Sequence, residues 1–511
     1  MLSKIYSVGL MGIDGFTVTV EVDISSGMPS FEIVGLPDAA IKESKDRIRA
    51  AMRNCNIPVP SKHITVNLAP ANMKKEGAAY DLPIATAIMA ASNKFNKDIL
   101  SKSAFIGELA LDGSIRTVNG VLPMAISAKK EGFDTIYVPE GNGKEASVIA
   151  GITVYPVNNL FELLEHLKGD ITITPVRGDP SQLLSRCNMY DVDFAEVKGQ
   201  EAVKRAVEIA AAGSHNILMI GSPGSGKSMI ARRIPTILPD MTIDEAIEVT
   251  KIHSVAGTLP HGESFVSTRP FRNPHHTISA AGLAGGGMNP KPGELSLAHN
   301  GVLFMDELPE FHKDVLEVLR QPMEDGFVTI SRVMGTVAYP CNTLFVGAMN
   351  PCKCGYYGDN EHICKCTPQS IEKYKSRISG PLMDRIDIHI NVPSVKFNDL
   401  HSKERGESSA DIKKRVNNAR KIQLNRFNGQ GIYSNSQMSA AQIEKYCSLD
   451  SGSKSILELA YTKLGLSARA HSRILKVART IADLDNEENI TANHIAEAIQ
   501  YRRLDREYTG V

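Results

Sequence analysis

Apolar and polar residues alternate, or recur at helical spacing, along the first third of the chain. Phe16 to Asp23 (FTVTVEVD) alternates as a half-buried strand does, and residues 39–52 place apolar side chains at helical spacing among lysines and arginines. Further short strands are predicted at residues 65–68, 103–106 and 135–139. We expect residues 1–168 to form one domain that mixes strands and helices.

A different pattern follows a segment without long apolar runs. Residues 169–193 contain two prolines, a glycine and an aspartate between positions 175 and 180, which predicts a linker. Between residues 194 and 395 the order becomes strand, glycine-rich loop, helix and strand. That order predicts an α/β domain built on a parallel sheet.

Residues 396–511 are polar and helical, and they are predicted to form a helical C-terminal domain. Ser439 and Gln442 have the spacing of a capping box, and Thr491 is the predicted N-cap of a helix over residues 492–502. One apolar stripe at helical spacing marks the face expected to pack on the core: Ile474, Val477, Ala478, Ile481 and Ala482.

Composition adds limits rather than a function. The 511 residues are too many for one core, and 57 Lys and Arg against 57 Asp and Glu leave no net charge. This balance excludes a strongly basic coat for nucleic acid, though not a local basic patch. No stretch reaches the roughly 18 apolar residues of a spanning helix, and the start lacks a signal-peptide pattern. We expect a cytoplasmic protein with no membrane partner.

One glycine-rich segment has the spacing that binds phosphate. Residues 216–220 (NILMI) form a short apolar strand, and residues 229–234 continue as a helix. The loop between them is Gly221, Ser222, Pro223, Gly224, Ser225, Gly226, Lys227 and Ser228. This is the context of a Walker A motif, whose backbone N–H groups and helix N-terminus face phosphate oxygens. We expect Lys227 to reach the β- and γ-phosphates and Ser228 to bind Mg²⁺.

Two acidic residues end a later apolar strand. Residues 301–305 (GVLFM) lead into Asp306 and Glu307, and parallel α/β sheets bind ligands at the carboxyl ends of their strands. Paired acids at a strand end are often only solvated, but a P-loop upstream favours a functional pair. Asp306 is predicted to orient the ligands of Mg²⁺, and Glu307 to polarise the attacking water. The two segments together predict an ATP site.

Three longer stretches carry a resemblance to one family. They are residues 269–277 (RPFRNPHHT), 292–309 (PGELSLAHNGVLFMDELP) and 378–387 (ISGPLMDRID). They are similar to the magnesium-chelatase subunit I branch of AAA+ ATPases, and specifically to the YifB/ComM competence-protein family. The resemblance covers nearly the whole chain. It implies an AAA+ ATPase domain over residues 194–395, a helical lid over 396–511, and a ring, expected to be a hexamer, that binds ATP and Mg²⁺ between subunits.

The same resemblance assigns three further residues. Asn350 ends the apolar strand 343–350, where AAA+ enzymes carry a sensor that holds water against the γ-phosphate. Arg385 falls at the position of the arginine finger, which enters the site of the neighbouring subunit. Arg469 falls at the second sensor on the lid, with Arg473 one turn later as the alternative. The competing interpretation is a strand cap for Asn350 and a surface ion pair for each arginine.

Residues 1–168 resemble the proteolytic domain of the Lon family. That domain pairs a serine in a short glycine-flanked segment with a lysine from a later helix. Ala79 stands at the serine position and Leu122 at the lysine position. Because neither a nucleophile nor a base is present, we expect a Lon-protease-like α+β domain without peptidase activity.

Four of the eight cysteines fall within residues 352–366. Cys352, Cys354, Cys364 and Cys366 form two CxC pairs, and four thiolates in so short an insert suit a closed, structural Zn²⁺ site. Free thiols and an iron–sulfur cluster are the alternatives. His362 is the nearest substitute ligand.

Two segments are predicted to line the pore of a ring and to contact DNA. They are a hairpin over residues 327–339 and the glycine-rich loop 281–287, which is expected to be too rich in glycine to pack. The cations nearest to them are Arg269, Arg272, Lys291 and Arg332.

The leading hypothesis is an ATP-driven DNA motor. It would be a branch-migration helicase that acts on single-stranded or branched DNA in recombination or natural transformation. A metal-chelatase-like subunit is disfavoured, because the Lon-like and four-cysteine modules are not parts of that subunit. An ATP-dependent regulator or remodeller of protein partners is the third interpretation.

Overall fold

The chain forms two compact units. The computed structural model describes residues 1–93, 95–179, 190–259, 263–287, 290–332, 335–359, 362–395, 406–464 and 466–502. One unit contains Met1–Cys187 and Ile243–Ser267, and the other contains Asn188–Thr242 and Thr268–Val511. The predicted segment 194–395 is therefore divided, because residues 243–267 belong to the N-terminal unit. Within the described ranges, no helix is long and apolar enough to cross a membrane.

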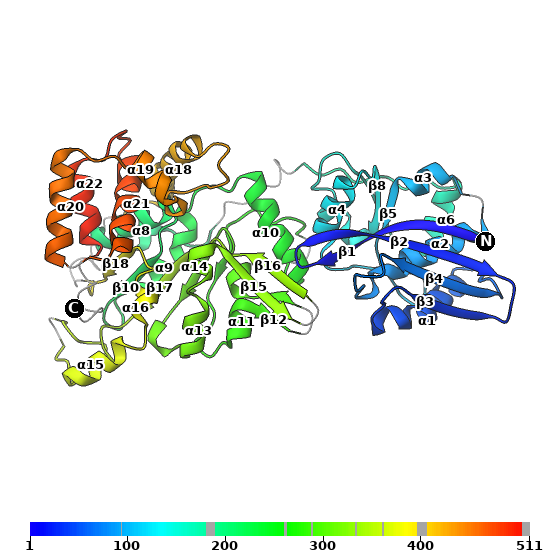
Figure 1. Cartoon of the computed structure of the whole chain (residues 1–511), viewed down its shortest axis with the longest axis horizontal. Helices are drawn as coiled ribbons and strands as arrows, with labels where there is room; N and C mark the ends of the chain where they lie inside the picture. The colour runs from blue at the N-terminus through cyan, green and yellow to red at the C-terminus, as the bar shows by residue number, and fades with distance from the viewer. Residues whose placement is uncertain are drawn as a thin grey trace. The chain divides into compact units, whose positions relative to one another are not determined.

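A seven-stranded mixed sheet forms the centre of the N-terminal unit (Figure 1). Its strands, in sheet order, are β3 (Ser30–Val34), β4 (His63–Ala69), β2 (Asp14–Ser25), β1 (Leu2–Met11), β5 (Ser103–Phe105), β8 (Thr135–Pro139) and β9 (Thr153–Val157). The pairs β1–β2 and β2–β4 are antiparallel, and the other neighbours are parallel. All four strands predicted from the alternating patterns are confirmed.

Helices pack against this sheet and bury its apolar side chains. They are α1 (Ala39–Asn54), α2 (Asp81–Ser92), α3 (Lys97–Ser101), α4 (Val121–Lys130), α5 (Gly143–Ala146) and α6 (Leu160–Lys168). A further helix, α10 (Ile243–Ala256), packs on α4, and a short ribbon pairs β6 (Glu108–Leu109) with β7 (Ile115–Arg116). The helix predicted at residues 39–52 is α1. It begins where the Asp38 carboxylate accepts a hydrogen bond from the N–H of Ile41.

A buried carboxylate joins α10 to the rest of the N-terminal unit. Glu145 accepts hydrogen bonds from the Ser254 hydroxyl on α10 and from the N–H of Leu122 on α4. The N–H of Gly120 also donates to the carbonyl of Ser254, at 3.1 Å. These bonds satisfy polar groups that would otherwise be buried without partners. They explain why α10, although it follows the P-loop helix in sequence, folds with the N-terminal unit.

The C-terminal unit is built on a five-stranded sheet whose neighbouring strands are all parallel. In sheet order the strands are β11 (Phe271–Arg272), β14 (Val302–Met305), β17 (Leu344–Met349), β10 (Ile217–Ile220) and β18 (Ile388–Asn391). β10, β14 and β17 are buried along their whole length, as expected for parallel strands covered on both faces. The predicted parallel α/β sheet is confirmed.

Short helices and two ribbons surround this sheet (Figure 1). The helices are α8 (Glu201–Gly213), α9 (Lys227–Ile237), α11 (Ala280–Ala284), α12 (Glu294–Leu297), α13 (Lys313–Val318), α14 (Pro322–Asp325), α15 (Pro368–Lys375) and α16 (Gly380–Met383). One ribbon pairs β12 (Gly285–Gly286) with β13 (Lys291–Pro292), and the other pairs β15 (Phe327–Arg332) with β16 (Gly335–Pro340). The predicted hairpin is β15–β16; its turn, at residues 333–334, lies outside the described residues.

The helical C-terminal region shares one apolar core with the sheet. Its helices are α18 (Ser409–Arg426), α19 (Ala440–Tyr446), α20 (Ser451–Leu464), α21 (Ala468–Leu484) and α22 (Ala492–Gln500), and they gather in orange and red in Figure 1. The predicted capping box at Ser439 and Gln442 and the N-cap at Thr491 are confirmed. The predicted apolar stripe on α21 is buried. The N–H of His389 on β18 donates to the carbonyl of Tyr501, which fastens the end of α22 to the sheet edge.

Candidate nucleotide site

The P-loop connects β10 to α9 in a conformation that only small residues permit. Gly224 and Gly226 have φ angles of 78° and 93°, in the left-handed region that favours glycine. A Cβ on Gly221 would lie 2.4 Å from the carbonyl oxygen of Val392. The loop therefore packs closely against the end of β18, and its glycines allow the tight turn that a phosphate-binding loop needs.

Lys227 is a buried cation whose hydrogen bonds go to neutral oxygens. Its Nζ donates to the carbonyls of Gly221 and Ser222 at 2.7 and 2.9 Å, and to the side-chain oxygen of Asn350 at 3.2 Å. Burial lowers the pKa of the ammonium group, and the charges of Asp306 and Glu307 partly oppose this. Among the ion pairs of the described residues, none involves Lys227. The ammonium group therefore lacks a negatively charged partner, and a bound phosphate would supply one.

Ser228 and Asp306 are brought together beside the lysine. The Ser228 hydroxyl donates to the Asp306 carboxylate at 2.6 Å, across the gap between α9 and the end of β14. A hydroxyl and a carboxylate oxygen next to a phosphate are the hard ligands that Mg²⁺ accepts, with water completing its shell. These two side chains would hold the ion, which would neutralise charge on the phosphates when bound.

Glu307 lies at the edge of this arrangement with its side chain largely exposed. Its φ is 50°, an uncommon value for a residue with a side chain, and it caps the turn that follows β14. Nδ1 of His276 lies 3.9 Å from its carboxylate. The sequence interpretation did not assign His276. Its only signal was its place in the segment RPFRNPHHT.

Arg385 points into the chain rather than into solvent. Its guanidinium pairs with Glu324 on α14 and donates to the carbonyl of Pro381 at 2.8 Å, and its side chain is 11% exposed. Its Nε is buried without a hydrogen-bond partner. None of the hydrogen bonds recorded for the described residues joins Arg385 to the P-loop of its own chain.

The two arginines considered for the second sensor differ sharply. Arg473 forms an ion pair with Asp387 at 3.0 Å, and Nδ1 of His215 lies 3.4 Å from the same carboxylate. Burial alone would raise the pKa of Asp387, but Arg473 and His215 hold it well below its usual range. Arg469, at the start of α21, is exposed. Arg473 therefore joins α21 to the residue before β18, and the second-sensor role of Arg469 stays a prediction.

One expectation for the segments predicted to contact DNA is wrong, namely that the glycine-rich loop would not pack. Residues 281–287 do pack: they form the end of α11 and the strand β12, and Leu283 is fully buried. A Cβ on Gly285 would lie 2.4 Å from the carbonyl oxygen of Lys291. Glycine at this position therefore allows the backbones of β12 and β13 to approach closely, and it does not indicate a flexible loop.

Two of the four cations predicted near DNA are already engaged. Arg269 is buried and donates to the carbonyls of Pro239 and Asn300 at 2.6 and 2.7 Å. Arg272 forms a bidentate ion pair with Glu294 at 2.6 and 2.7 Å. Both arginines therefore have partners within the chain that the sequence did not reveal, whereas Lys291 and Arg332 are exposed.

The structure also locates the four predicted cysteine ligands and the two positions that replace the Lon dyad. The Sγ atoms of Cys352, Cys354, Cys364 and Cys366 lie within 4.8 Å of one another, in the segment between β17 and α15. In the N-terminal unit, Ala79 lies in a short 3₁₀ turn (Ala78–Tyr80) and Leu122 is fully buried on α4. Neither position carries a polar side chain.

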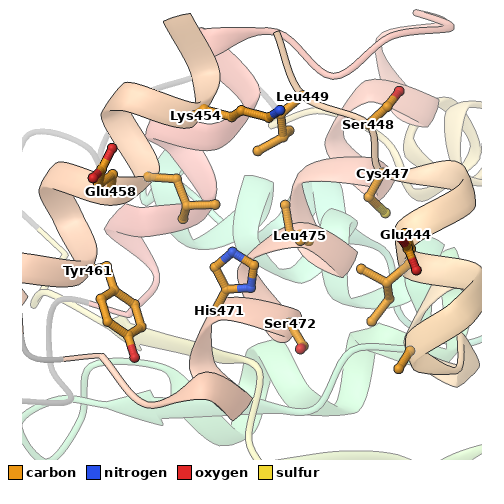
Figure 2. Close-up of a pocket in the computed structure, with 13 residues that line it drawn as sticks. Glu444, Cys447, Ser448, Leu449, Lys454, Glu458, Tyr461, His471, Ser472 and Leu475 are labelled. Atoms are coloured by element: carbon orange, nitrogen blue, oxygen red, sulfur yellow. The ribbon is translucent and has the colours of Figure 1, made fainter. Parts of the chain in front are cut away.

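A separate hollow of about 770 Å³ opens among α19, α20 and α21. Figure 2 shows Cys447, His471 and Leu475 around it, with Glu458 and Tyr461 on α20. None of the residues predicted to bind nucleotide, metal or DNA lines it. It is a feature of the helical region and not part of the P-loop site.

Comparison with known proteins identifies the family. The family described as "Magnesium chelatase, subunit ChlI" matches residues 193–400, "Subunit ChlI of Mg-chelatase" matches 20–142, and "Magnesium chelatase, subunit ChlI C-terminal" matches 406–502. Competence protein ComM of Haemophilus influenzae is 42% identical over 509 residues, which cover 99% of this chain and 98% of that protein. The chain belongs to the YifB/ComM family. YifB of Escherichia coli is also 42% identical, over 506 residues.

The family gives the architecture around the site. It is a magnesium-chelatase-like AAA+ ATPase, which implies ATP and Mg²⁺ as cofactors. The likeness to Lon is weaker: Lon protease of Endomicrobium trichonymphae is 27% identical over 164 residues, or 30% of this chain. The Lon-like interpretation of the N-terminal unit therefore stays a prediction.

Arg473→Ala and Arg469→Ala should separate a structural arginine from a functional one. Loss of Arg473 leaves the buried Asp387 carboxylate without its main partner, so the free energy of unfolding should fall by about 2 to 4 kcal/mol. This stabilisation should be present near neutral pH and lost in acid, as pH falls through the lowered pKa of Asp387. Denaturant unfolding measures it. Arg469→Ala should keep wild-type stability but lose ATP turnover; equal stability losses in both variants would contradict the assignment.

Proposed function

We propose that this protein is a ring-forming ATPase that uses ATP hydrolysis to move on DNA, with branch migration of single-stranded or branched DNA as its activity. The observation that supports ATP binding best is the buried Lys227 ammonium, which is hydrogen-bonded only to neutral oxygens beside the Ser228–Asp306 pair. Glu307, just beyond the pair, is the proposed base that polarises the attacking water. Asn350 is the proposed sensor, because its side chain already contacts the lysine that would hold the γ-phosphate.

A ring, proposed to be a hexamer, supplies what a single chain lacks. Arg385 makes none of its recorded contacts with the P-loop of its own chain, and its motif follows the sensor strand. As an arginine finger it would stabilise charge on the phosphate bound to the neighbouring subunit. Glu324 would then serve as the resting partner that keeps the guanidinium extended until the neighbouring site is filled.

Two ribbons support DNA as the polymer that the ring holds. β12–β13 and β15–β16 lie side by side, since Ile330 would be only 2.9 Å from a Cβ on Gly285, and the guanidinium of Arg332 lies 3.4 Å from the corresponding position of Gly286. The exposed Lys291 and Arg332 thus belong to adjacent ribbons. Two neighbouring cations on protruding backbone suit phosphate contact without reading sequence.

Other features agree with this proposal. A relative that covers the full length of the chain is named a competence protein, which fits a role in handling DNA during uptake. The four-cysteine cluster is the proposed site of a structural Zn²⁺, and reduced thiols suit the cytoplasm. A remodeller of protein partners is the alternative function, and it would not need Lys291 or Arg332.

Lys227→Ala and Glu307→Gln should fail at different steps. Lys227 contacts phosphate in the ground state, so its removal should abolish tight ATP binding. Glu307 acts on water only during hydrolysis, so Glu307→Gln should bind ATP normally and lose turnover by about 100-fold or more. Equilibrium binding of a fluorescent ATP analogue and steady-state phosphate release measure the two steps. Normal hydrolysis by Glu307→Gln would show that another group is the base.

Arg385→Ala should slow hydrolysis by about 10³-fold or more while leaving ATP binding nearly intact, because the finger acts on the neighbouring site. Mixing this variant with Lys227→Ala should restore part of the activity, since some mixed interfaces pair an intact P-loop with an intact finger. A purely structural Arg385–Glu324 pair predicts otherwise. In that case both Arg385→Ala and Glu324→Gln would lose stability, and mixing would rescue nothing.

The double variant Lys291→Ala/Arg332→Ala should bind single-stranded DNA more weakly, with similar loss for every sequence. If each cation contacts one phosphate, the slope of log affinity against log salt should become shallower by about 2. Fluorescence anisotropy across a salt series measures both quantities.

The matched control is Lys102→Ala/Arg116→Ala, which removes the same charges from exposed positions of the N-terminal unit. It should leave DNA affinity and the salt slope unchanged. An equal loss of DNA affinity in the two double variants would show that the effect comes from net charge and not from contacts of Lys291 and Arg332. No DNA binding by the wild-type protein at any salt concentration would favour the protein-remodelling alternative.

A further inference from the structure

The four cysteines have the geometry of a site for one tetrahedral ion. The Sγ of Cys352 lies 3.3 Å from that of Cys354 and 3.7 Å from that of Cys364, and Cys354 and Cys364 are 3.6 Å apart. Four sulfurs bound to Zn²⁺ at about 2.3 Å are separated by about 3.8 Å, whereas a disulfide needs about 2.05 Å. The N–H of Cys366 also points to the sulfur of Cys364, at 3.5 Å. These distances fit a shared metal and exclude a disulfide in this arrangement.

The same loop rests directly on the P-loop. Gly355, which lies between the two CxC pairs, is buried against Pro223, and a Cβ at this position would lie 2.5 Å from the proline Cδ. Its φ of 89° turns the chain there. The backbone of Gly355 therefore packs directly against Pro223, and a side chain at position 355 would displace the proline.

The base of the loop is tied to the sensor residue. Cys352 is fully buried and follows Asn350 by two positions, and the Asn350 side chain accepts a hydrogen bond from Lys227. On the far side of the loop, α15 begins at Pro368, two residues after Cys366, and its Tyr374 is buried. The cysteine segment thus begins beside Asn350, and Gly355 packs against Pro223 of the P-loop.

We propose that Zn²⁺ bound by these four cysteines controls ATP affinity by holding Gly355 against Pro223 and Asn350 against Lys227. This proposal rests on the zinc site and the ATP site proposed above. Without the ion, four thiols within a short loop have little to hold them together, because in many small metal sites the binding free energy of the metal is also the folding free energy. The P-loop then loses its support on one side, and the sensor loses its fixed position.

Two glycine variants separate this coupling from the metal itself. Gly355 and Gly358 both have left-handed φ angles, of 89° and 77°, but a Cβ on Gly358 meets nothing within 4 Å. Gly355→Ala and Gly358→Ala therefore carry a similar backbone strain, and only the first displaces Pro223. Both should retain about one zinc per chain by elemental analysis, while only Gly355→Ala should bind a non-hydrolysable ATP analogue about tenfold or more weakly.

Removal of the metal tests whether the zinc ion itself is needed for ATP affinity. Chelator-treated wild-type protein, and Cys354→Ser, should lose zinc and bind the analogue about tenfold more weakly, and added Zn²⁺ should restore affinity only in the wild type. Cys55→Ser, outside the cluster, should change neither value. Equal affinities of the two glycine variants, unchanged affinity after metal loss, or protein purified without zinc would each overturn the proposal. The ATPase function is judged separately, because it fails only if Lys227→Ala binds the analogue as the wild type does.

Discussion

The nucleotide site depends on the buried Lys227 ammonium, which forms no ion pair with a carboxylate among the described residues. Lys227 spans from the P-loop carbonyls to Asn350 at the end of β17, so one cation joins two strands that are far apart in sequence. Burial of a charge that binds only neutral oxygens is costly unless an anion arrives. The site is therefore arranged for phosphate before phosphate binds, and ATP relieves a cost that the folded chain already carries.

The order of the strands explains which residues meet around that cation. β17 is the later strand in sequence, yet it lies between β14 and β10 in the sheet. Because all of these strands are parallel, their carboxyl ends share one edge, where Asn350 stands between Asp306 and the P-loop. The cysteine segment leaves the same edge directly after Asn350. The proposed zinc site therefore lies next to the end of the central strand, where Asn350 meets Lys227.

The parts that sequence predicted well are local in the chain. The P-loop, the acidic strand end, the capping box at Ser439 and the alternating strands each depend on neighbours a few residues apart, and all take the predicted local form. What sequence missed depends on distant partners. The glycines at 285–287 were expected to be loose, but a glycine also allows two backbones to approach closely, and Gly285 does this with Lys291. Arg269 and Arg272 looked like free cations because their partners, the carbonyls around Pro239 and the carboxylate of Glu294, are 22 to 31 residues away.

Helix α10 shows the same limit at the scale of a domain. The residue pattern of 243–256 predicts a helix, but it does not indicate which of the two units the helix joins. Contacts with distant residues decide it, among them the bond from Ser254 to the buried Glu145, 109 positions away, and the ion pair of Lys251 with Asp14. The ATPase segment thus gives up a helix to the N-terminal unit, and the chain passes between the units more often than a simple order of domains suggests.

The segment around Arg385 connects the sheet of the C-terminal unit to two neighbouring elements, α14 and α21. Arg385 turns toward Glu324 on α14, next to the β15–β16 ribbon, while Asp387, two residues later, turns toward Arg473 on α21. Asn216, just before β10, holds the backbone between them: its side chain donates to the carbonyl of Arg385, and its N–H donates to the Asp387 carboxylate, each at 3.1 Å. If Arg385 leaves Glu324 to meet a neighbouring phosphate, α14 loses a partner beside the ribbon that carries Arg332. The Asp387–Arg473 pair stays buried and keeps the helical region attached to the sheet. The two neighbours of this motif thus differ: the Arg385–Glu324 pair lies beside the ribbon, and the Asp387–Arg473 pair joins the helical region to the sheet.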